Sequence, residues 1–252
     1  MPTIGVINQK GGVGKTTTAV NLAAALAERR RILLVDLDPQ ANASSGVGVS
    51  EPDMTIYDVI SGSSSARQAV MRTGIENLDL LAASDDLAGA AVELDASRDN
   101  LMLLSRSLIG VRPTYDFIVI DAPPSMGALT LNALGAADQL LIPLQTEYYA
   151  LEGIASMMET VDRVRGSLNR DIRILGILLT MFDVRTRLSQ EVEENVRRHF
   201  EKLVFRTVIP RTVRLAEAPS YGRSIFEYAP SSQGAIAYRE LAEEVIERVS
   251  EG

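Results

Sequence analysis

The sequence of 252 residues contains no cysteine, which excludes disulfides, thiolate catalysis, cysteine-ligated zinc and iron–sulfur clusters. Long apolar runs are also missing. The longest stretches, such as residues 174–181, fall far short of the roughly 18 to 20 residues that span a bilayer. The N-terminus does not have the basic segment and apolar core of a secretory signal, so we expect a cytoplasmic protein.

Lysine is scarce: only three of the 25 basic residues are lysine, and two of them, Lys10 and Lys15, fall in one glycine-rich loop. The 33 acidic residues give a net charge of −8, which argues against a uniformly basic nucleic-acid binder. Hydrophobic residues make up 46% and charged residues 23%, as in ordinary globular proteins. This length is enough for one large domain.

Apolar runs bounded by turn residues alternate with helical patterns along the whole chain. The runs lack polar alternation, so they predict strands that are buried on both faces. These strands are expected at residues 3–8, 32–36, 78–82, 116–121, 139–144, 172–180 and 203–209, and helices at 16–28, 85–94, 100–110, 128–137, 149–167, 189–200 and 235–249. We therefore expect residues 1–252 to form a single α/β domain: a doubly wound, mostly parallel sheet with helices on both faces and ligands at the carboxyl ends of its strands.

A glycine-rich loop joins the first predicted strand to the first predicted helix, which is the context of a phosphate-binding loop. Its glycines let backbone N–H groups turn toward phosphate oxygens, Lys15 adds a positive charge near the β- and γ-phosphates, and Thr16 is placed to offer its hydroxyl to Mg²⁺. The residues expected to bind the nucleotide are Lys10, Gly11, Gly12, Val13, Gly14, Lys15, Thr16 and Thr17.

The loop is a variant of the strict G-x-x-x-x-G-K-T pattern. Gln9 stands where that pattern has glycine, and Lys10 is an additional lysine. A glycine-rich turn at the start of a helix is the alternative, but it explains neither lysine nor Thr16.

Three aspartates follow apolar strands at the edge of the sheet where the phosphate loop emerges. Asp121 ends a continuous apolar strand and is expected to reach Mg²⁺ together with Thr16. Asp38 lies just past the end of another strand, close to Asp36, and is expected to orient the attacking water. Any one such aspartate commonly caps a turn, but three around one phosphate loop favour a catalytic site.

Five segments carry a resemblance to a known family: KGGVGKTT at 10–17, DLDPQAN at 36–42, FIVIDAPPS at 117–125, LLTMFDVRT at 178–186 and IPRTVRLAEAPSYG at 209–222. Together they make the sequence resemble the ParA/Soj family of deviant Walker A P-loop ATPases, which move chromosomes and plasmids. The resemblance implies hydrolysis of ATP with Mg²⁺, with Lys10, Lys15 and Asp38 as catalytic residues. It also implies an ATP-bound homodimer in which Lys10 reaches the partner's phosphates, and an adenine contact from Pro210 and Thr212, where many relatives have asparagine in place of Thr212.

The same resemblance implies a working cycle on the nucleoid. The ATP-bound dimer would bind double-stranded DNA non-specifically, and a ParB-type partner protein would stimulate hydrolysis and release it. Because the chain begins directly at its first strand, we expect no N-terminal DNA-reading domain and no specific operator binding.

Relatives with other functions remain as alternatives. Proteins that ligate iron–sulfur clusters are excluded because the chain has no cysteine. A MinD-like or other cargo-positioning ATPase is one alternative. However, residues 224–252 carry a net charge of −4, which disfavours binding to an anionic membrane. Their apolar positions are instead expected to pack on the sheet: Ile236, Leu241, Val245 and Val249. An ATP-dependent small-molecule ligase of the dethiobiotin synthetase type is the alternative from a different class.

One segment is basic although the chain is acidic: residues 185–223 carry a charge of +4, which leaves −12 for the rest. Such a segment is typical of a surface that tracks DNA phosphates, and an ATP-dependent dimer would double it. Arg185, Arg187 and Arg214 are the expected DNA contacts because they flank the nucleotide loops. Arg197 and Arg198 share a helix with three glutamates and are expected to form ordinary ion pairs. His199 is expected on the helix surface.

Overall fold

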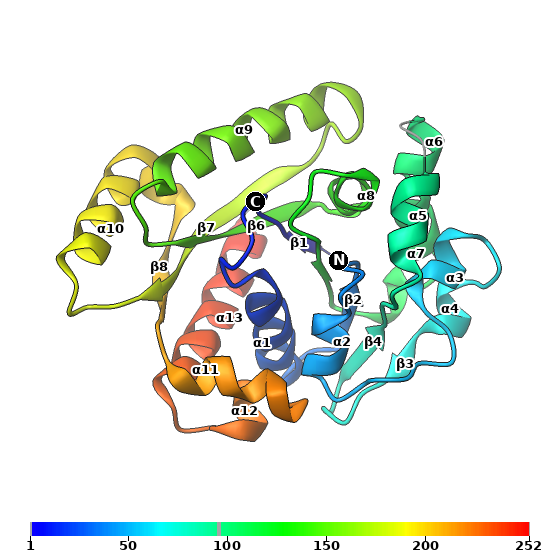
Figure 1. Ribbon diagram of the computed structural model, residues 1–252, viewed down its shortest axis with the longest axis horizontal. Coiled ribbons are helices and arrows are strands. Elements are labelled where there is room, and N and C mark those ends of the chain that lie inside the picture. The colour runs from blue at the N-terminus through cyan, green and yellow to red at the C-terminus, as the bar shows by residue number, and fades with distance from the viewer. Residues whose placement is uncertain (1, 95–96, 252) are drawn as a thin grey trace.

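The computed structural model describes residues 2–94 and 97–251, and its centre is an eight-stranded sheet with the order β3-β4-β2-β5-β1-β6-β7-β8 (Figure 1). Every neighbouring pair is parallel except β3 and β4. The strands are β1 (Thr3–Val6), β2 (Ile32–Asp36), β3 (Met71–Arg72), β4 (Leu78–Leu81), β5 (Phe117–Asp121), β6 (Gln139–Gln145), β7 (Arg173–Phe182) and β8 (Val204–Pro210). The chain first builds the sheet on one side of β1 and then continues from β6 on the other side, so the topological switch point lies at β1.

Helices cover both faces of this sheet. On one face lie α1 (Lys15–Ala27), α2 (Asn42–Gly46), α11 (Val213–Glu217), α12 (Ile225–Tyr228) and α13 (Gln233–Glu251). On the other face lie α3 (Ile56–Ile60), α4 (Ala66–Ala69), α5 (Leu87–Glu93), α6 (Arg98–Leu101), α7 (Leu103–Leu108), α8 (Ala128–Ala136), α9 (Ala150–Ser167) and α10 (Arg187–Phe200). In Figure 1, α8 and α9 lie above the sheet and α1 and α13 below it. The predicted doubly wound, mostly parallel architecture is confirmed.

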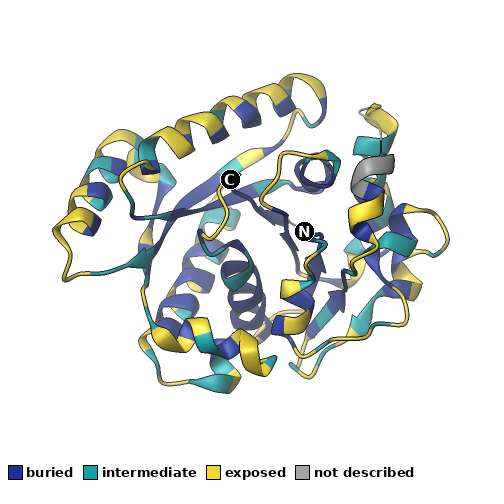
Figure 2. Cartoon of the chain, viewed as in Figure 1, coloured by how far each residue is buried: buried dark blue, intermediate teal, exposed yellow. Residues whose placement is uncertain are grey.

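The apolar character of the strands follows from burial on both sides. In β2, Ile32 and Leu34 enter the core under α1 and α13, whereas Leu33 and Val35 enter the core under α7 and α8. All four side chains are inaccessible to solvent. The central strands β1, β2 and β5 are buried along their whole length and are dark blue in Figure 2. Alternating side chains thus serve two different cores, which is why the sequence shows continuous apolar runs instead of alternation.

The sequence predicted the long elements better than the short ones. The two-residue antiparallel strand β3 was not predicted, nor were the short helices α2, α11 and α12. The helix expected at 100–110 is split at Met102 into α6 and α7, and β1 ends at Val6, two residues earlier than expected. Elements of two to five residues contain too little periodicity to be recognised without their tertiary contacts.

The C-terminal helix α13 packs on the sheet as predicted, with one exception. Leu241 and Val245 are fully buried, and Val249 is partly buried against the same core. Ile236, however, is 42% exposed, so its predicted packing on the sheet is wrong. It lies one turn from the start of the helix, on the side away from the neighbouring residues Ala235 and Ala237, which are buried.

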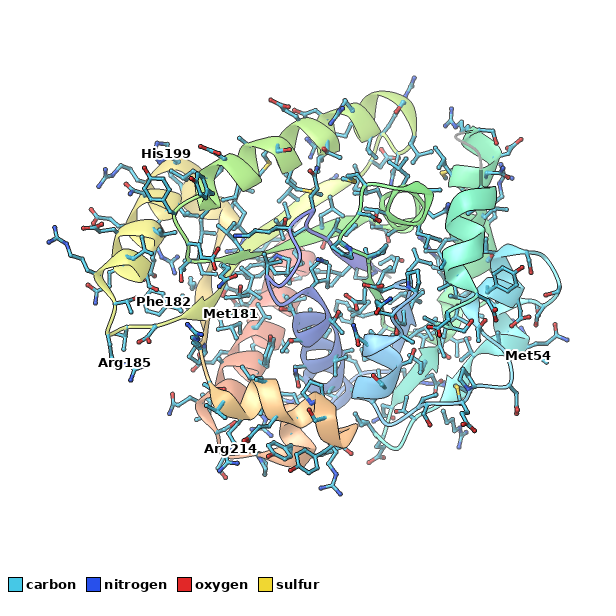
Figure 3. The ribbon with its side chains drawn as sticks, viewed as in Figure 1. Met54, Met181, Phe182, Arg185, His199 and Arg214 are labelled. Carbon is cyan, nitrogen blue, oxygen red and sulfur yellow. The ribbon has the colours of Figure 1, made fainter. Side chains whose placement is uncertain are left out.

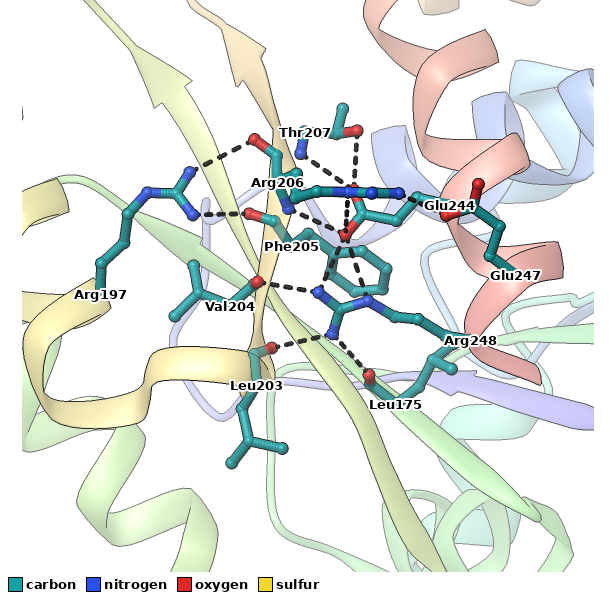
Figure 4. A network of polar contacts seen from close by, with 10 residues as sticks. All are labelled: Leu175, Arg197, Leu203, Val204, Phe205, Arg206, Thr207, Glu244, Glu247 and Arg248. Atoms are coloured by element: carbon teal, nitrogen blue, oxygen red, sulfur yellow. Dashed lines mark hydrogen bonds and ion pairs between the residues drawn. The ribbon is translucent and has the colours of Figure 1, made fainter. Parts of the chain in front are cut away.

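Strand β8 lies at the edge of the sheet, and charged side chains cover its free backbone groups (Figure 4). Glu244 of α13 accepts hydrogen bonds from the N–H groups of Arg206 and Thr207 at 2.9 and 3.0 Å. Arg248 donates to the carbonyls of Leu175, Leu203 and Val204, and Arg197 from α10 donates to those of Phe205 and Arg206. These contacts occupy backbone groups of β8 from Val204 to Thr207 and so hinder pairing of this edge with another chain.

Glu244 is the centre of this network and is only 4% exposed. Burial alone would raise the pKa of its carboxyl, but the hydrogen bonds from Thr207, Arg206 and Arg248 outweigh burial and lower the pKa. Because the pKa is lower in the folded state, this carboxylate stabilises the fold above its unfolded pKa, and the contribution is lost as the pH falls through the folded value.

We predict that Glu244→Ala lowers the free energy of unfolding by about 3–5 kcal/mol, because it removes the carboxylate partner of Arg248 and the acceptor of two backbone N–H groups of the edge strand. Urea denaturation measures the loss. Glu247→Ala is the matched control, because it removes only the exposed ion pair with Arg206 and is expected to cost about 0–1 kcal/mol. Equal losses for the two variants would contradict the central position of Glu244.

Candidate functional site

The phosphate loop connects β1 to α1 at the carboxyl edge of the sheet, next to the switch point. Gly12 and Gly14 have positive φ angles of 75° and 85°, a left-handed backbone that glycine adopts without strain. The Thr180 hydroxyl, at the end of β7, donates a 2.8 Å hydrogen bond to the carbonyl of Val13. The loop is thus shaped by its glycines and held by a side chain from β7, the second strand from β1 in the sheet.

Lys15 begins α1 and folds back over the loop, where it is buried. Its ammonium donates to the carbonyl of Lys10 at 3.0 Å. Burial lowers the pKa of Lys15, whereas the nearby carboxylates of Asp121 and Asp38 act to raise it. An ammonium has three N–H donors, so this arrangement leaves it able to bind phosphate oxygens as well.

Asp121 ends β5 beside the loop and is completely buried. Among the described residues, neither of its carboxylate oxygens has a hydrogen-bond partner. Burial raises the pKa of Asp121 well above its usual range and the charge of Asp36 adds to this, while the nearby Thr16 hydroxyl and the Lys15 ammonium oppose it. A buried carboxylate without donors is poised for a cation.

The oxygen ligands available at Asp121 fit Mg²⁺. A carboxylate and the hydroxyl of Thr16 are oxygen ligands of the kind this ion prefers, and phosphate oxygens and waters complete its octahedron in nucleotide sites. In the part of the chain that the structure describes, no group of three or more His, Cys, Asp or Glu side chains is placed to hold a metal alone. The site therefore suits an ion that arrives with a nucleotide.

The connection between β2 and α2 brings two more aspartates to the same edge. Asp36 accepts 2.8 Å hydrogen bonds from both the N–H and the hydroxyl of Ser44, and burial raises its pKa to about 6. Asp38 is also buried and accepts from the N–H of Gln40 at 3.0 Å. The charge of Asp38 acts to raise the pKa of both Lys15 and Asp121, so Asp38 belongs to the same cluster.

A cavity of about 550 Å³ opens beside the loop. It joins Gly14 and Thr17 of the phosphate loop to Pro210 and Thr212, which are nearly 200 positions away in the sequence. Its lining also includes Thr180, Met181, Arg185, Ile209, Arg211, Val213, Leu215, Ala216 and Tyr238. The structure thus brings together the residues predicted to hold the phosphates and those predicted to hold adenine.

Several residues of this site were not predicted from the sequence. Met181 lines the cavity with a positive φ of 52°, a strained conformation for a residue with a side chain (Figure 3). Tyr238 of α13 forms part of the cavity wall, and its buried hydroxyl lies 3.3 Å from that of Thr18. Met181 lies within the segment LLTMFDVRT, but no role was predicted for it. Tyr238 belongs to no motif, so only the packing of α13 against α1 reveals it.

The side chain of Lys10 bonds outside its own loop. It is 51% exposed and forms an ion pair with Glu147, on the connection between β6 and α9. Glu147 was not predicted as part of the site. Its position just after a parallel strand could have placed Glu147 near the site from the sequence, because all parallel strands of the sheet end at this edge.

The three arginines predicted to contact DNA lie at the surface, each paired with a nearby acid. Arg185 pairs with Asp183 at 2.8 Å, Arg187 with Glu191 at 2.7 Å and Arg214 with Glu217 at 3.1 Å. Figure 3 labels Arg185 in the connection from β7 to α10 and Arg214 on α11. Because these pairs are exposed to water, each is weak and is easily exchanged.

The other basic residues on α10 follow the prediction. Arg197 and Arg198 pair with Glu193 and Glu194, one helical turn away. His199 is exposed on the same helix, and its ring Nδ1 lies 2.7 Å from the carbonyl of Asn195 (Figure 3).

Comparison with known proteins identifies the family. A family model described as an AAA domain matches residues 1–174. Soj of Bacillus subtilis, a sporulation initiation inhibitor protein, is 49% identical over 96% of this chain and 97% of its own length. The chromosome-partitioning ATPase Soj of Thermus thermophilus is 51% identical over 98% and 96%. The chain belongs to the Soj/ParA family of ATPases.

Solved structures agree with this fold. A cobyrinic acid a,c-diamide synthase from Mycobacterium smegmatis, with bound ADP and magnesium, superimposes with a TM-score of 0.86 and 36% identity over 99% of this chain and 96% of that one. The same enzyme is also known with an ATP analogue and magnesium. The cell division ATPase MinD of Pyrococcus furiosus has a TM-score of 0.83 and 28% identity, with 98% of each chain covered.

These relationships bear on the predicted chemistry. The prediction of an ATPase that uses ATP and Mg²⁺ is confirmed at the level of the Soj/ParA family and its structural neighbours. Among the described residues, no helix combines the length and the apolar character that crossing a membrane requires.

We predict that Asp121→Asn raises the stability of the ligand-free protein and weakens its response to Mg·ATP. The substitution removes a buried charge that has no hydrogen-bond donor, but it also removes the anionic metal ligand. Thermal unfolding with and without Mg·ATP measures both effects. A ligand at one hundred times its Kd adds about 2.7 kcal/mol of stability, and this gain is expected to shrink toward zero in the variant.

Asp116→Asn serves as the control for this experiment, because Asp116 is an exposed aspartate just before β5, at the opposite edge of the sheet. It is expected to leave the Mg·ATP response unchanged. A full response in Asp121→Asn would contradict the assignment of Asp121 to the metal.

Proposed function

We propose that this chain is a Soj/ParA-type partitioning ATPase that acts in the cytoplasm on the nucleoid and segregates a chromosome or plasmid. Mg·ATP drives formation of a sandwich homodimer, the dimer binds double-stranded DNA without sequence preference, and hydrolysis stimulated by a ParB-type partner releases it. The observation that carries this proposal is the second lysine of the phosphate loop, Lys10, which is about half exposed and pairs with Glu147 outside its own loop.

Each side chain of the site has a role in this cycle. Lys15 holds the β- and γ-phosphates from within the loop, and its burial strengthens this interaction because water does not screen it. Thr16 and Asp121 hold Mg²⁺, which when bound neutralises charge on the phosphate oxygens. Asp38 orients the water that attacks the γ-phosphate, and Pro210 and Thr212 contact adenine from the far side of the cavity.

Lys10 acts in trans, on the phosphates of the partner subunit, somewhat as an arginine finger does. To do so it must leave Glu147. Both side chains of the ion pair are about half exposed, so breaking it costs about 0–1 kcal/mol. This cost is small compared with the energy of a charge-assisted contact to a triphosphate. Glu147 thus keeps Lys10 at the rim of the loop without locking it there.

DNA binding is assigned to Arg185, Arg187 and Arg214. All three lie near the nucleotide cavity, and Arg185 is part of its lining. Their acidic partners lower the local positive charge of one chain, and the dimer would place two such surfaces side by side. Exchange of exposed carboxylates for DNA phosphates also makes binding salt-sensitive.

Two alternative functions are weighed by the same observations. A small-molecule synthase is favoured by the structural likeness to the cobyrinic acid a,c-diamide synthase, but identity to the Soj relatives is higher. A MinD-like membrane cycle is disfavoured by α13, which exposes Glu240, Glu243 and Glu251 at its surface. Such a helix is repelled by anionic lipids.

We predict that the protein binds duplex DNA with ATP, and much more weakly with ADP or without nucleotide. Fluorescence anisotropy with a random-sequence duplex at two salt concentrations measures the difference, and the ATP-dependent affinity is expected to fall at the higher salt. Binding that is independent of nucleotide, or absent, would favour one of the two alternatives.

Arg214→Ala is expected to weaken this binding and to reduce the salt slope by about one, with ATP affinity unchanged. Arg198→Ala is the matched control, because Arg198 is equally exposed and paired but lies on the outer part of α10. If the two variants bind alike, Arg214 is not a DNA contact.

We predict that Asp38→Ala retains the ATP-dependent dimer and loses ATP turnover, because it removes the group that orients water and leaves Lys10 and Lys15 in place. Sedimentation velocity with ATP and a phosphate-release assay measure the two properties. Lys10→Ala is the contrasting variant: it is expected to bind ATP as a monomer and fail to dimerise. Normal turnover in Asp38→Ala would overturn the role of Asp38.

A further inference from the structure

Gln9 occupies the position where the strict phosphate-loop pattern has glycine, and its side chain is tied to a distant helix. The amide Nε2 donates a 3.0 Å hydrogen bond to the hydroxyl of Thr160, 151 positions along the chain on α9. The amide oxygen lies 3.5 Å from the hydroxyl of Ser156, one turn earlier on the same helix. A glycine at this position has no side chain with which to make either contact.

Thr160 is a firm anchor for this contact. It is buried, and its hydroxyl donates to the carbonyl of Ser156 at 3.0 Å while it also accepts from Arg163 at 3.2 Å. The neighbouring side chains Met157 and Val161 are fully buried in the core beneath α9. The acceptor that Gln9 uses is therefore held by its own helix and by the packing of that helix on the sheet.

Further contacts connect the start of the loop to the same part of the fold. The side chain of Asn8 donates to the carbonyl of Pro143 in β6 at 2.7 Å and accepts from the N–H of Lys10 at 3.0 Å. The Lys10 ammonium pairs with Glu147, on the connection between β6 and α9. Residues 8, 9 and 10 each bond to the segment formed by β6, that connection and α9.

We infer that Gln9 is a positioning residue that acts through Lys10: its amide fixes the start of the phosphate loop to α9 and so sets the direction in which Lys10 leaves the loop. Asn8 accepts a hydrogen bond from the backbone N–H of Lys10, and Gln9, the residue before Lys10, is anchored by its side chain to Thr160. This inference rests on the proposed role of Lys10 on the partner's phosphates. It also explains why this loop has a glutamine in place of the first glycine.

The test separates positioning from nucleotide binding. Gln9→Ala is expected to weaken the ATP-dependent dimer and lower kcat by about three- to tenfold, the range for loss of a partly buried hydrogen bond. ATP affinity of the monomer and KM are expected to stay unchanged, because Lys15 and the glycines are untouched. Sedimentation velocity, binding of a fluorescent ATP analogue and steady-state kinetics measure these quantities.

Thr160→Val removes the acceptor hydroxyl at nearly equal volume and is expected to reproduce the Gln9→Ala phenotype, and the double variant is expected to lose no more than either single variant. Ser167→Ala on the same helix is the matched control, because that hydroxyl bonds only to the carbonyl of Arg163 within α9. Additive losses, or a Gln9→Ala protein that forms the wild-type dimer, would overturn the inference.

The Lys10→Ala variant, measured beside Gln9→Ala, distinguishes this inference from the proposed function. If Lys10→Ala itself dimerises normally, the proposed role of Lys10 fails, whatever Gln9 does. If Lys10→Ala abolishes the dimer and Gln9→Ala does not weaken it, only the role of Gln9 fails.

Discussion

The structure depends on a concentration of buried charge at one edge of the sheet. Lys15, Asp36, Asp38 and Asp121 are all buried there, and Asp121 has no hydrogen-bond donor among the described residues. Collecting three carboxylates around one ammonium costs stability, because each charge loses its hydration. That cost is offset when a cation and a polyphosphate enter, so the same burial that strains the ligand-free protein favours binding of Mg·ATP.

The parallel sheet explains why these charges meet and why much of the site was predictable. Strands buried on both faces appear as continuous apolar runs, and all of the parallel strands end at one edge, so Asp38, Asp121 and the glycine loop were expected to converge there. The contacts of Glu147 and Gln9 were not predictable, since each links residues more than 130 positions apart. Nothing local in the sequence reports which side chain meets which across the edge of a sheet.

The ion pairs of the molecule are of two kinds, one buried and one exposed. Glu244 and Arg248 are mostly buried and hold β8, which leads into Pro210 and the nucleotide cavity. The pairs of Arg185, Arg187 and Arg214 are exposed and weak. A rigid edge strand thus presents a loop and an adjoining helix whose surface charges exchange partners readily. The net charge of −8 sums over buried and exposed groups of the whole chain. It is therefore a poor guide to the charge of the surface around Arg185, Arg187 and Arg214.

The choice of lysine over arginine follows the same physical logic. The chain uses arginine for nearly all of its cations, and arginine suits fixed, planar contacts such as those of Arg248 with three backbone carbonyls. Lysine occurs at two positions of the phosphate loop, where a compact charge on a flexible stem is needed. Lys15 folds back over its own loop, and in the proposed cycle Lys10 exchanges Glu147 for a phosphate. A guanidinium held by a planar, bidentate pair with Glu147 would be harder to release.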